Sequence, residues 1–184
     1  MAKYIRTIFL TLILSLVLCV PCFAQLLYGA GNFTYFSVND NWRKIPVNDN
    51  VTLNIITIAY GRDTMVALKK SNYRAGLRKL KDYSEADKVA IRDSCINSSL
   101  TNLRSQGFNI KVSSAVISNN VIIIVYDCFK DGIRYRGSET VTVKDYQAYT
   151  LVQFSPSETE LIKEIFNAID NLYVQGIPWN DWIK

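Results

Sequence analysis

Residues 121–128 carry the sequence feature that most limits the fold, a strand-length run that is apolar on both faces. Successive side chains of a β-strand point to opposite sides of the sheet. A run of this kind therefore buries both faces only inside a sheet that has a layer on each side. Asp131-Gly132, a strong hairpin signal, follows before residues 133–136. The segment predicts a central strand, covered on both sides and paired with the strand after it.

A long helix is predicted before this strand. It begins after Ser84, a good N-cap with Asp87 three residues later, and Gly107 is placed to close it. Its apolar stripe consists of Val89, Ile96, Leu100 and Leu103. At 100° per residue this stripe leaves Cys95 on the flank of the helix.

A second helix is predicted near the C-terminus, where Ser157 and Glu160 form a capping box introduced by Pro156. Its apolar residues recur at helical spacing: Leu161, Ile162, Ile165, Phe166, Ile169 and Leu172. A stripe of this kind has to lie on a sheet.

The remaining segments read mainly as strands. Alternating or β-branched runs predict strands at residues 32–38, 51–60, 108–114 and 146–154, and residues 140–143 either continue the strand at 133–136 or start another. Residues 65–83 instead have partial helical spacing, interrupted by Gly76. The element order predicts an α+β fold, a mostly antiparallel sheet flanked by helices in an α/β/α sandwich.

The N-terminus has the three-part layout of a secretory signal peptide. Lys3 and Arg6 give a positive start, residues 8–20 are almost entirely apolar, and Pro21 precedes the small residue Ala24. We expect cleavage after Ala24, which leaves residues 25–184 as one secreted or periplasmic domain. An uncleaved anchor is an alternative, but the apolar run is shorter than the roughly 20 residues that span a bilayer. Lipidation is another, although neither Cys19 nor Cys22 follows a small residue.

Removal of this segment also changes the charge and the cysteine content. Lys3 and Arg6 leave, so the net charge of +5 falls to a mild +3, which does not indicate nucleic-acid binding. Cys19 and Cys22 leave as well. Cys95 and Cys128 then form an even pair in an oxidising compartment, which favours a disulfide, with two independent thiols as the alternative.

Four stretches resemble the PsbP-like fold, named for an extrinsic subunit of photosystem II. They are FTYFSVNDNW at residues 33–42, LRSQGFNIKVSS at 103–114, DGIRYRGSETVTVKDYQAYTLVQFSPSE at 131–158, and the closing amphipathic helix. The resemblance spans most of residues 33–173 and concerns structural positions. It implies the fold. It implies little about function, because relatives range from photosystem subunits to bacterial envelope proteins and binding adaptors. No manganese or calcium signature residue carries over.

The sequence contains no histidine. This excludes Ser-His-Asp and Cys-His nucleophilic machinery and every zinc site that uses histidine. No glycine-rich phosphate loop is present, and the acidic residues gather near the predicted helix starts, where they favour the positive helix end. We therefore expect no enzyme activity, no cofactor and no metal.

A basic segment is the first candidate binding feature. It has six cations and no acid: Lys69, Lys70, Arg74, Arg78, Lys79 and Lys81. It suits an anionic partner such as lipid head groups, a polyanionic glycan or an acidic protein face. The alternative is a solvated face balanced by the acidic residues that follow it.

The C-terminal tail is the second candidate. Trp179 and Trp182 suit a protein-binding anchor, because aromatic residues are enriched at binding hot spots. The alternative is that the tail folds back and the rings cap the core.

These features predict an exported, non-enzymatic accessory or binding protein of the cell envelope or exterior. Its partner is an unknown protein or an anionic surface, not nucleic acid, and the mature form does not span the membrane. A secreted inhibitor or immunity-type protein that blocks a partner enzyme is the alternative.

Overall fold

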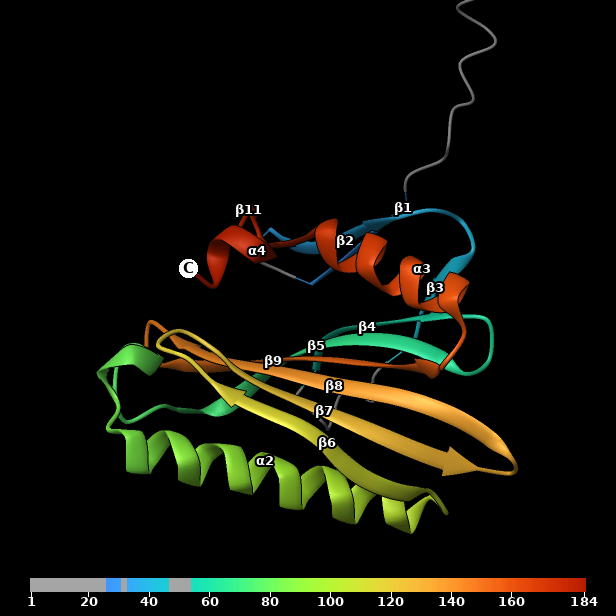
Figure 1. Cartoon of the computed structure of the whole chain (residues 1–184). Helices are drawn as coiled ribbons and strands as arrows, with labels where there is room; N and C mark the ends of the chain where they lie inside the picture. The colour runs from blue at the N-terminus through green and yellow to red at the C-terminus, as the bar shows by residue number, and fades with distance from the viewer. Residues whose placement is uncertain (1–25, 31–32, 47–53) are drawn as a thin grey trace, which may run out of the picture.

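The computed structural model describes residues 26–30, 33–46 and 54–184 (Figure 1). The predicted signal peptide lies outside the described residues. Two antiparallel sheets and the helices beside them form stacked layers, with α2 on one side of the larger sheet and α3, α4 and the smaller sheet on the other. The fold is therefore α+β, as the sequence predicts.

The larger sheet has seven strands in the order β3-β4-β5-β9-β8-β7-β6, and every neighbouring pair is antiparallel. Its strands are β3 (Trp42–Lys44), β4 (Asn54–Tyr60), β5 (Thr64–Arg74), β6 (Asn109–Ile117), β7 (Ile122–Lys130), β8 (Ile133–Lys144) and β9 (Gln147–Pro156). Asp131 and Gly132 both have positive φ values, 51° and 78°, so the predicted Asp-Gly hairpin joins β7 to β8.

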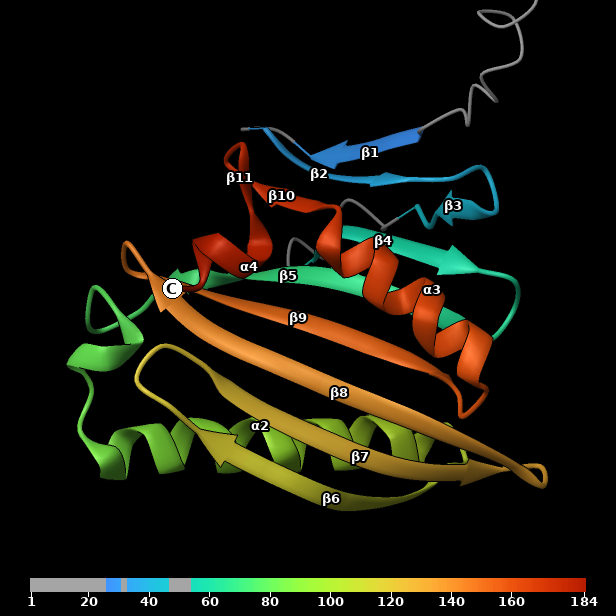
Figure 2. The same cartoon turned by 45° about the horizontal axis from the view of Figure 1, so that its top comes forward.

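The smaller sheet brings the two ends of the described chain together. Its strands, in the order β1-β2-β10-β11, are β1 (Leu26–Ala30), β2 (Thr34–Val38), β10 (Leu172–Val174) and β11 (Ile177–Pro178). The same layer contains helices α3 (Thr159–Asp170) and α4 (Trp179–Trp182) (Figure 2).

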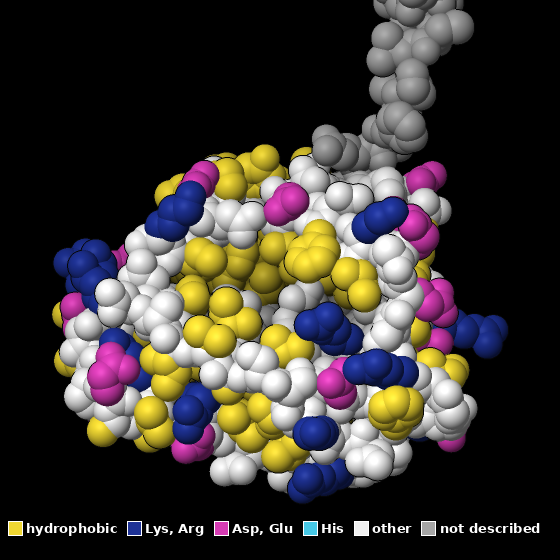
Figure 3. Space-filling view, viewed as in Figure 1, with side chains coloured by type: hydrophobic (Ala, Val, Ile, Leu, Met, Phe, Trp, Pro, Cys, Tyr) yellow, Lys and Arg dark blue, Asp and Glu magenta, His cyan; other side chains and the backbone are white. Residues whose placement is uncertain are grey.

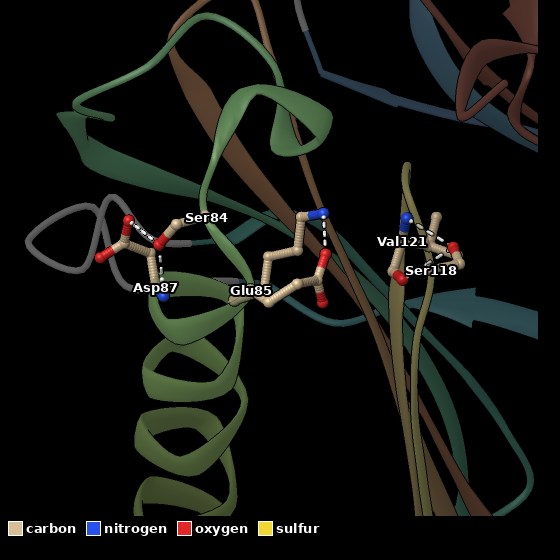
Figure 4. A network of polar contacts seen from close by, with 6 residues as sticks. Ser84, Glu85, Asp87, Ser118 and Val121 are labelled. Carbon is tan, nitrogen blue, oxygen red and sulfur yellow. Dashed lines mark hydrogen bonds and ion pairs between the residues drawn. The ribbon is translucent and has the colours of Figure 1, made fainter.

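Helix α2 (Glu85–Ser105) begins as the sequence predicts, one residue after Ser84. The Ser84 hydroxyl accepts a hydrogen bond from the Asp87 backbone N–H at 3.1 Å and donates one to the Asp87 carboxylate at 2.6 Å (Figure 4). One residue into the helix, Glu85 pairs at 2.8 Å with the buried Lys88 ammonium. The short 3₁₀ helix η1 (Leu80–Asp82) leads into this capped start. Because the cap satisfies otherwise unpaired N–H groups, it defines where α2 begins.

The two long helices cover opposite faces of the large sheet, and they cover different halves. Helix α2 packs on β6 and β7, and together they enclose a core that includes Ile110, Ile122 and Ile124. Helix α3 packs on β2, β5 and β9, around a second core that includes Phe36, Ile56 and Leu68. Each face of the sheet is therefore covered over one half and more open over the other (Figure 1).

Two predicted elements differ from the structure, and one open alternative is decided. Residues 64–74 form strand β5 rather than a weak helix, because pairing with β4 and β9 overrides the partial helical spacing. Residues 140–143 continue the strand at 133–136 as one strand, β8, which is one of the two alternatives from the sequence. Helix α3 has Glu158 at its N-cap without a side-chain hydrogen bond, so the Ser157 capping box does not form.

Helix α2 presents most of the predicted stripe to the core below it, because Ile96, Leu100 and Leu103 pack there. Val89 is exposed, and Ile91 and Cys95 also pack against this core. Cys128 lies in the same core, and both cysteines are free thiols. The structure describes them as two thiols, and the disulfide expected from the sequence stays a prediction. Burial, the first cause in each case, raises the pKa of both thiols to about 11.

Candidate functional site

A cleft of about 410 Å³ opens on the α2 side of the large sheet, over the half that α2 leaves uncovered. We call it the α2-side cleft. Its floor comes from the sheet and includes Ala59, Met65, Glu139 and Val152. Ser99, Asn102, Leu103 and Gln106 of α2 form one wall. The volume lies in the roughly 300–1,000 Å³ range of small-molecule sites.

Glu139 is the buried acid of this cleft, and it lies on β8 in phase with the core residues Val141 and Val143. The Ser99 hydroxyl of α2 donates a hydrogen bond to the Glu139 carboxylate. Burial raises the pKa of Glu139, while the Ser99 hydroxyl, the Lys69 ammonium and the Tyr126 hydroxyl act in the opposite direction. Glu139 therefore holds its proton to a higher pH than an exposed glutamate does.

Tyr126 of β7 adds a second polar group to the floor. Its side chain is almost fully buried, and its hydroxyl has no hydrogen-bond partner of good geometry in the described structure. Burial, followed by the charge of Glu139, raises the pKa of Tyr126, so the hydroxyl keeps its proton. It lies beside Ser99 and Glu139 on the cleft floor, where it can also donate to a ligand.

Aromatic rings form one end of the cleft. Tyr135 and Phe154 stack with their ring centroids 5.2 Å apart, and Phe108 meets both rings edge-on. Lys130 places its ammonium 5.0 Å from the Phe108 ring centroid. This end offers flat apolar surface beside charge, the combination that binds amphipathic ligands.

Charged side chains of both signs line the rest of the cleft. Arg43, Arg62 and Lys69 lie there with Asp63 and Asp131. The Arg43 guanidinium donates to the Gly61 carbonyl at 3.4 Å. The cleft thus combines an apolar floor, a buried acid and a mixed-charge border.

The structure separates the residues of the basic segment. Lys69 lies on the α2 side of β5 and lines the cleft, whereas Lys70, the next residue along the strand, points to the opposite face. The Arg74 guanidinium lies 4.2 Å from the Tyr146 ring centroid, and Arg78 pairs with Asp145 at 3.2 Å. Lys79 caps η1 beside the exposed Lys81. The six cations therefore do not form one surface.

The tryptophan tail lies in the core. Trp179 and Trp182 are each only 2% exposed, and their rings stack 5.7 Å apart. Tyr149 meets Trp182 edge-on at 4.6 Å, and the Lys144 ammonium donates to the Trp182 carbonyl at 2.7 Å. The rings cap the α3-side core, so they are not exposed to a partner.

The sequence analysis did not identify Ser99, Tyr126 or Glu139. A usable indication was present for Glu139, because it alternates in phase with Tyr135, Val141 and Val143 once residues 133–144 are taken as one strand. Because the sequence leaves open whether residues 140–143 continue the strand at 133–136, the inward position of Glu139 was not recognised. The meeting of Ser99 with Glu139 joins residues 40 positions apart and has no local sequence pattern.

In the part of the chain that the structure describes, the cysteine and acidic side chains indicate no metal site, and the helices indicate no membrane crossing. No group of three such side chains could hold a metal ion in the described residues. Likewise, no helix within the described ranges is both long and apolar enough to cross a bilayer.

Comparison with known proteins identifies a similar fold among solved structures. No protein-family model matches the sequence, and no curated protein matches it. The structure is similar to the solution structure of cyanobacterial PsbP (CyanoP) from Synechocystis sp. PCC 6803, with a TM-score of 0.54 and 13% identity over 85% of this chain and 95% of that one. A weaker likeness, with a TM-score of 0.36 and 11% identity over 78% of this chain and 86% of that one, joins it to LpqN, involved in cell envelope biogenesis of Mycobacterium tuberculosis. The chain has a PsbP-like fold, which confirms the resemblance read from the sequence.

Proposed function

We propose that this chain is an exported, non-enzymatic accessory or binding protein of the cell envelope or exterior, and that its ligand occupies the α2-side cleft. The observation that carries the proposal is the cleft floor, where the buried Tyr126 hydroxyl and the buried Glu139 carboxyl lie among apolar side chains. Few convergent polar groups in an apolar cavity are typical of small-molecule sites.

Export is part of the same proposal and rests on the N-terminal sequence. Residues 1–24 have the composition of a secretory signal peptide that ends at Ala24.

A binding role fits the chemistry of the cleft better than catalysis does. Without histidine in the sequence, the commonest general base is missing. Ser99 donates its hydroxyl hydrogen to Glu139 and so holds that carboxyl in one orientation. These groups can orient a ligand by donating and accepting hydrogen bonds.

The alternative from the sequence, an inhibitor or immunity-type protein, needs an exposed recognition surface. The tryptophan rings lie in the core, and the basic segment is divided between several places. Neither the tryptophan tail nor the basic segment therefore supports the inhibitor alternative as one exposed recognition surface.

Native mass spectrometry of the chain recovered from its own envelope or culture fluid tests the proposal. We expect an N-terminus at Gln25 and an additional mass that is released on unfolding. Met65→Trp, which fills the cleft floor, should lose that mass, whereas Leu27→Trp on the exposed surface of β1 should keep it. A ligand mass that Met65→Trp retains would place the ligand elsewhere, and a retained N-terminal segment would contradict export.

A further inference from the structure

The outward face of β7 differs from the covered strand that its sequence predicts. Ile122, Ile124 and Cys128 are buried below α2. On the other face Ile123 is 38% and Phe129 50% exposed, although both are as apolar as the buried set. A contiguous exposed apolar surface of this kind is typical of a site that another molecule covers.

Neighbouring elements extend this apolar surface. Val116 of the edge strand β6 pairs with Ile123 and is 54% exposed, and Phe166 of α3 is 57% exposed. Between α3 and the sheet lies a groove of about 250 Å³ whose apolar lining is Ile123, Val125, Ile162, Ile165 and Phe166. We call it the α3-side groove. Figure 3 shows hydrophobic side chains gathered around a recess on this side of the molecule, with basic side chains beside it.

The open part of the sheet has the width of one helix. Beyond α3, the outward face consists of β8, β7 and β6. Strands lie about 4.8 Å apart, so these three span about 10 Å, close to the 10–12 Å diameter of a helix with its side chains. On the opposite face, α2 packs on β6 and β7. One further helix beside α3 would complete the layer.

Charge distinguishes one end of the groove. Lys111, Asp127 and Arg136 lie directly opposite one another across β6, β7 and β8. Arg134 lies one row further along the same face and pairs with Asp127 at 2.9 Å. Three cations and one acid give this end a net positive charge, and Arg136 also lines the groove. An occupant with acidic residues at this end complements it.

We propose that the α3-side groove docks one amphipathic helix of a protein partner, with an apolar stripe over Ile123, Val125 and Phe166 and acidic residues beside Lys111 and Arg136. An amphipathic helix in a hydrophobic groove is a recurring mode of peptide recognition. The proposal does not depend on the α2-side cleft, which lies on the other face of the sheet.

Two synthetic helical peptides test the proposal, both with the same leucine stripe at i, i+3, i+4 and i+7. One carries glutamates at one end of its flank and the other carries lysines at the same positions. In fluorescence-polarisation titrations against the full chain, the glutamate peptide should bind at least about tenfold more tightly, a ratio of the size that interfacial charge complementarity supplies. Arg136→Glu should reduce or reverse that ratio.

Variants of the groove separate it from other apolar surface. Phe166→Asp should weaken the glutamate peptide at least about tenfold, because it removes an aromatic contact and introduces repulsion. Leu27→Asp is the matched control, an exposed apolar residue on β1 that should leave binding unchanged. Circular dichroism of each variant checks that the fold is kept, which the exposure of both sites favours.

Four outcomes would overturn the proposal. Equal affinity for the two peptides would contradict the proposed charge pattern. Binding that Phe166→Asp does not weaken would contradict docking of the helix in the groove. Sedimentation of the chain with phosphatidylglycerol vesicles that is lost in Phe166→Asp, without peptide binding, would assign the groove to a membrane surface. A concentration-dependent dimer that Phe166→Asp dissociates would assign it to a second copy of the chain.

Discussion

Glu139 connects the cleft to the stability of the protein. Its folded pKa is raised, chiefly by burial, so the folded state binds the proton more tightly than the unfolded chain does. The resulting stabilisation is fully present below the ordinary glutamate pKa and is lost as the pH rises through the folded pKa. As the pH rises from the ordinary glutamate pKa to the higher pKa of folded Glu139, the free energy of unfolding should therefore fall.

Glu139→Gln should flatten that pH dependence. Glutamine has no proton to lose and still accepts the Ser99 hydrogen bond, so the variant should gain stability relative to the natural chain as the pH rises above the ordinary glutamate pKa of about 4. Urea unfolding at a series of pH values measures this. A Glu139→Gln profile parallel to that of the natural chain would show that Glu139 does not titrate differently on folding.

The two free thiols give a second residue-scale prediction. With a pKa of about 11, Cys95 and Cys128 are thiolates in about one molecule in 3,000 at pH 7.5, against about one in ten for an ordinary thiol of pKa 8.5. Iodoacetamide should therefore label the folded chain about two orders of magnitude more slowly than the unfolded chain. Intact mass before and after reduction is the companion measurement: a change of two hydrogens would reveal a disulfide between these residues.

At the scale of elements, the start of α2 depends on a local cap. Ser84→Ala removes the acceptor of the Asp87 N–H and should cost about 1 kcal/mol of unfolding free energy. Ser94→Ala, exposed within the same helix, should instead be neutral or slightly stabilising, because alanine has the higher helix propensity. Equal effects of the two substitutions in chemical denaturation would argue against a role for the cap.

The C-terminal tail is an element of the core. Trp182 is buried against Tyr149 and Trp179, so Trp182→Ala should destabilise by about 3–5 kcal/mol through the cavity it leaves. Ile177→Ala, at an exposed site five residues earlier, should change the unfolding free energy little. Thermal unfolding followed by far-UV circular dichroism compares the two. A loss of partner binding without a loss of stability in Trp182→Ala would instead support the tail as an anchor.

The sequence predicted an element correctly where residues within that element determine its structure. Ser84, the Asp131-Gly132 turn and the stripe around Ile165 gave the start of α2, the β7–β8 hairpin and the existence of α3. It failed at β5, whose strand conformation comes from pairing with β4 and β9, partners remote in sequence on one side. The cleft could not be predicted for the same reason, because its lining joins α2 to six different strands.

At the scale of the whole molecule, staggered helices explain both surfaces. Helix α2 covers β6 and β7 on one face, and α3 covers β5 and β9 on the other. The half that α2 leaves open forms a cleft with a buried acid and a buried hydroxyl, whereas the half that α3 leaves open forms an apolar groove with a basic end. One sheet thereby presents two surfaces of different chemistry, suited to a small ligand and to a protein segment.

Methyl NMR distinguishes these surfaces most directly. Met65 is the one methionine besides Met1 and lies in the α2-side cleft, and Ile123 lies in the α3-side groove, so methionine and isoleucine methyl labels report on each. When a small-molecule fraction of the native envelope or culture fluid is added, the proposed function predicts that the Met65 methyl resonance shifts while that of Ile123 stays in place. A shift of Ile123 with Met65 unmoved would contradict the assignment of the ligand to the cleft.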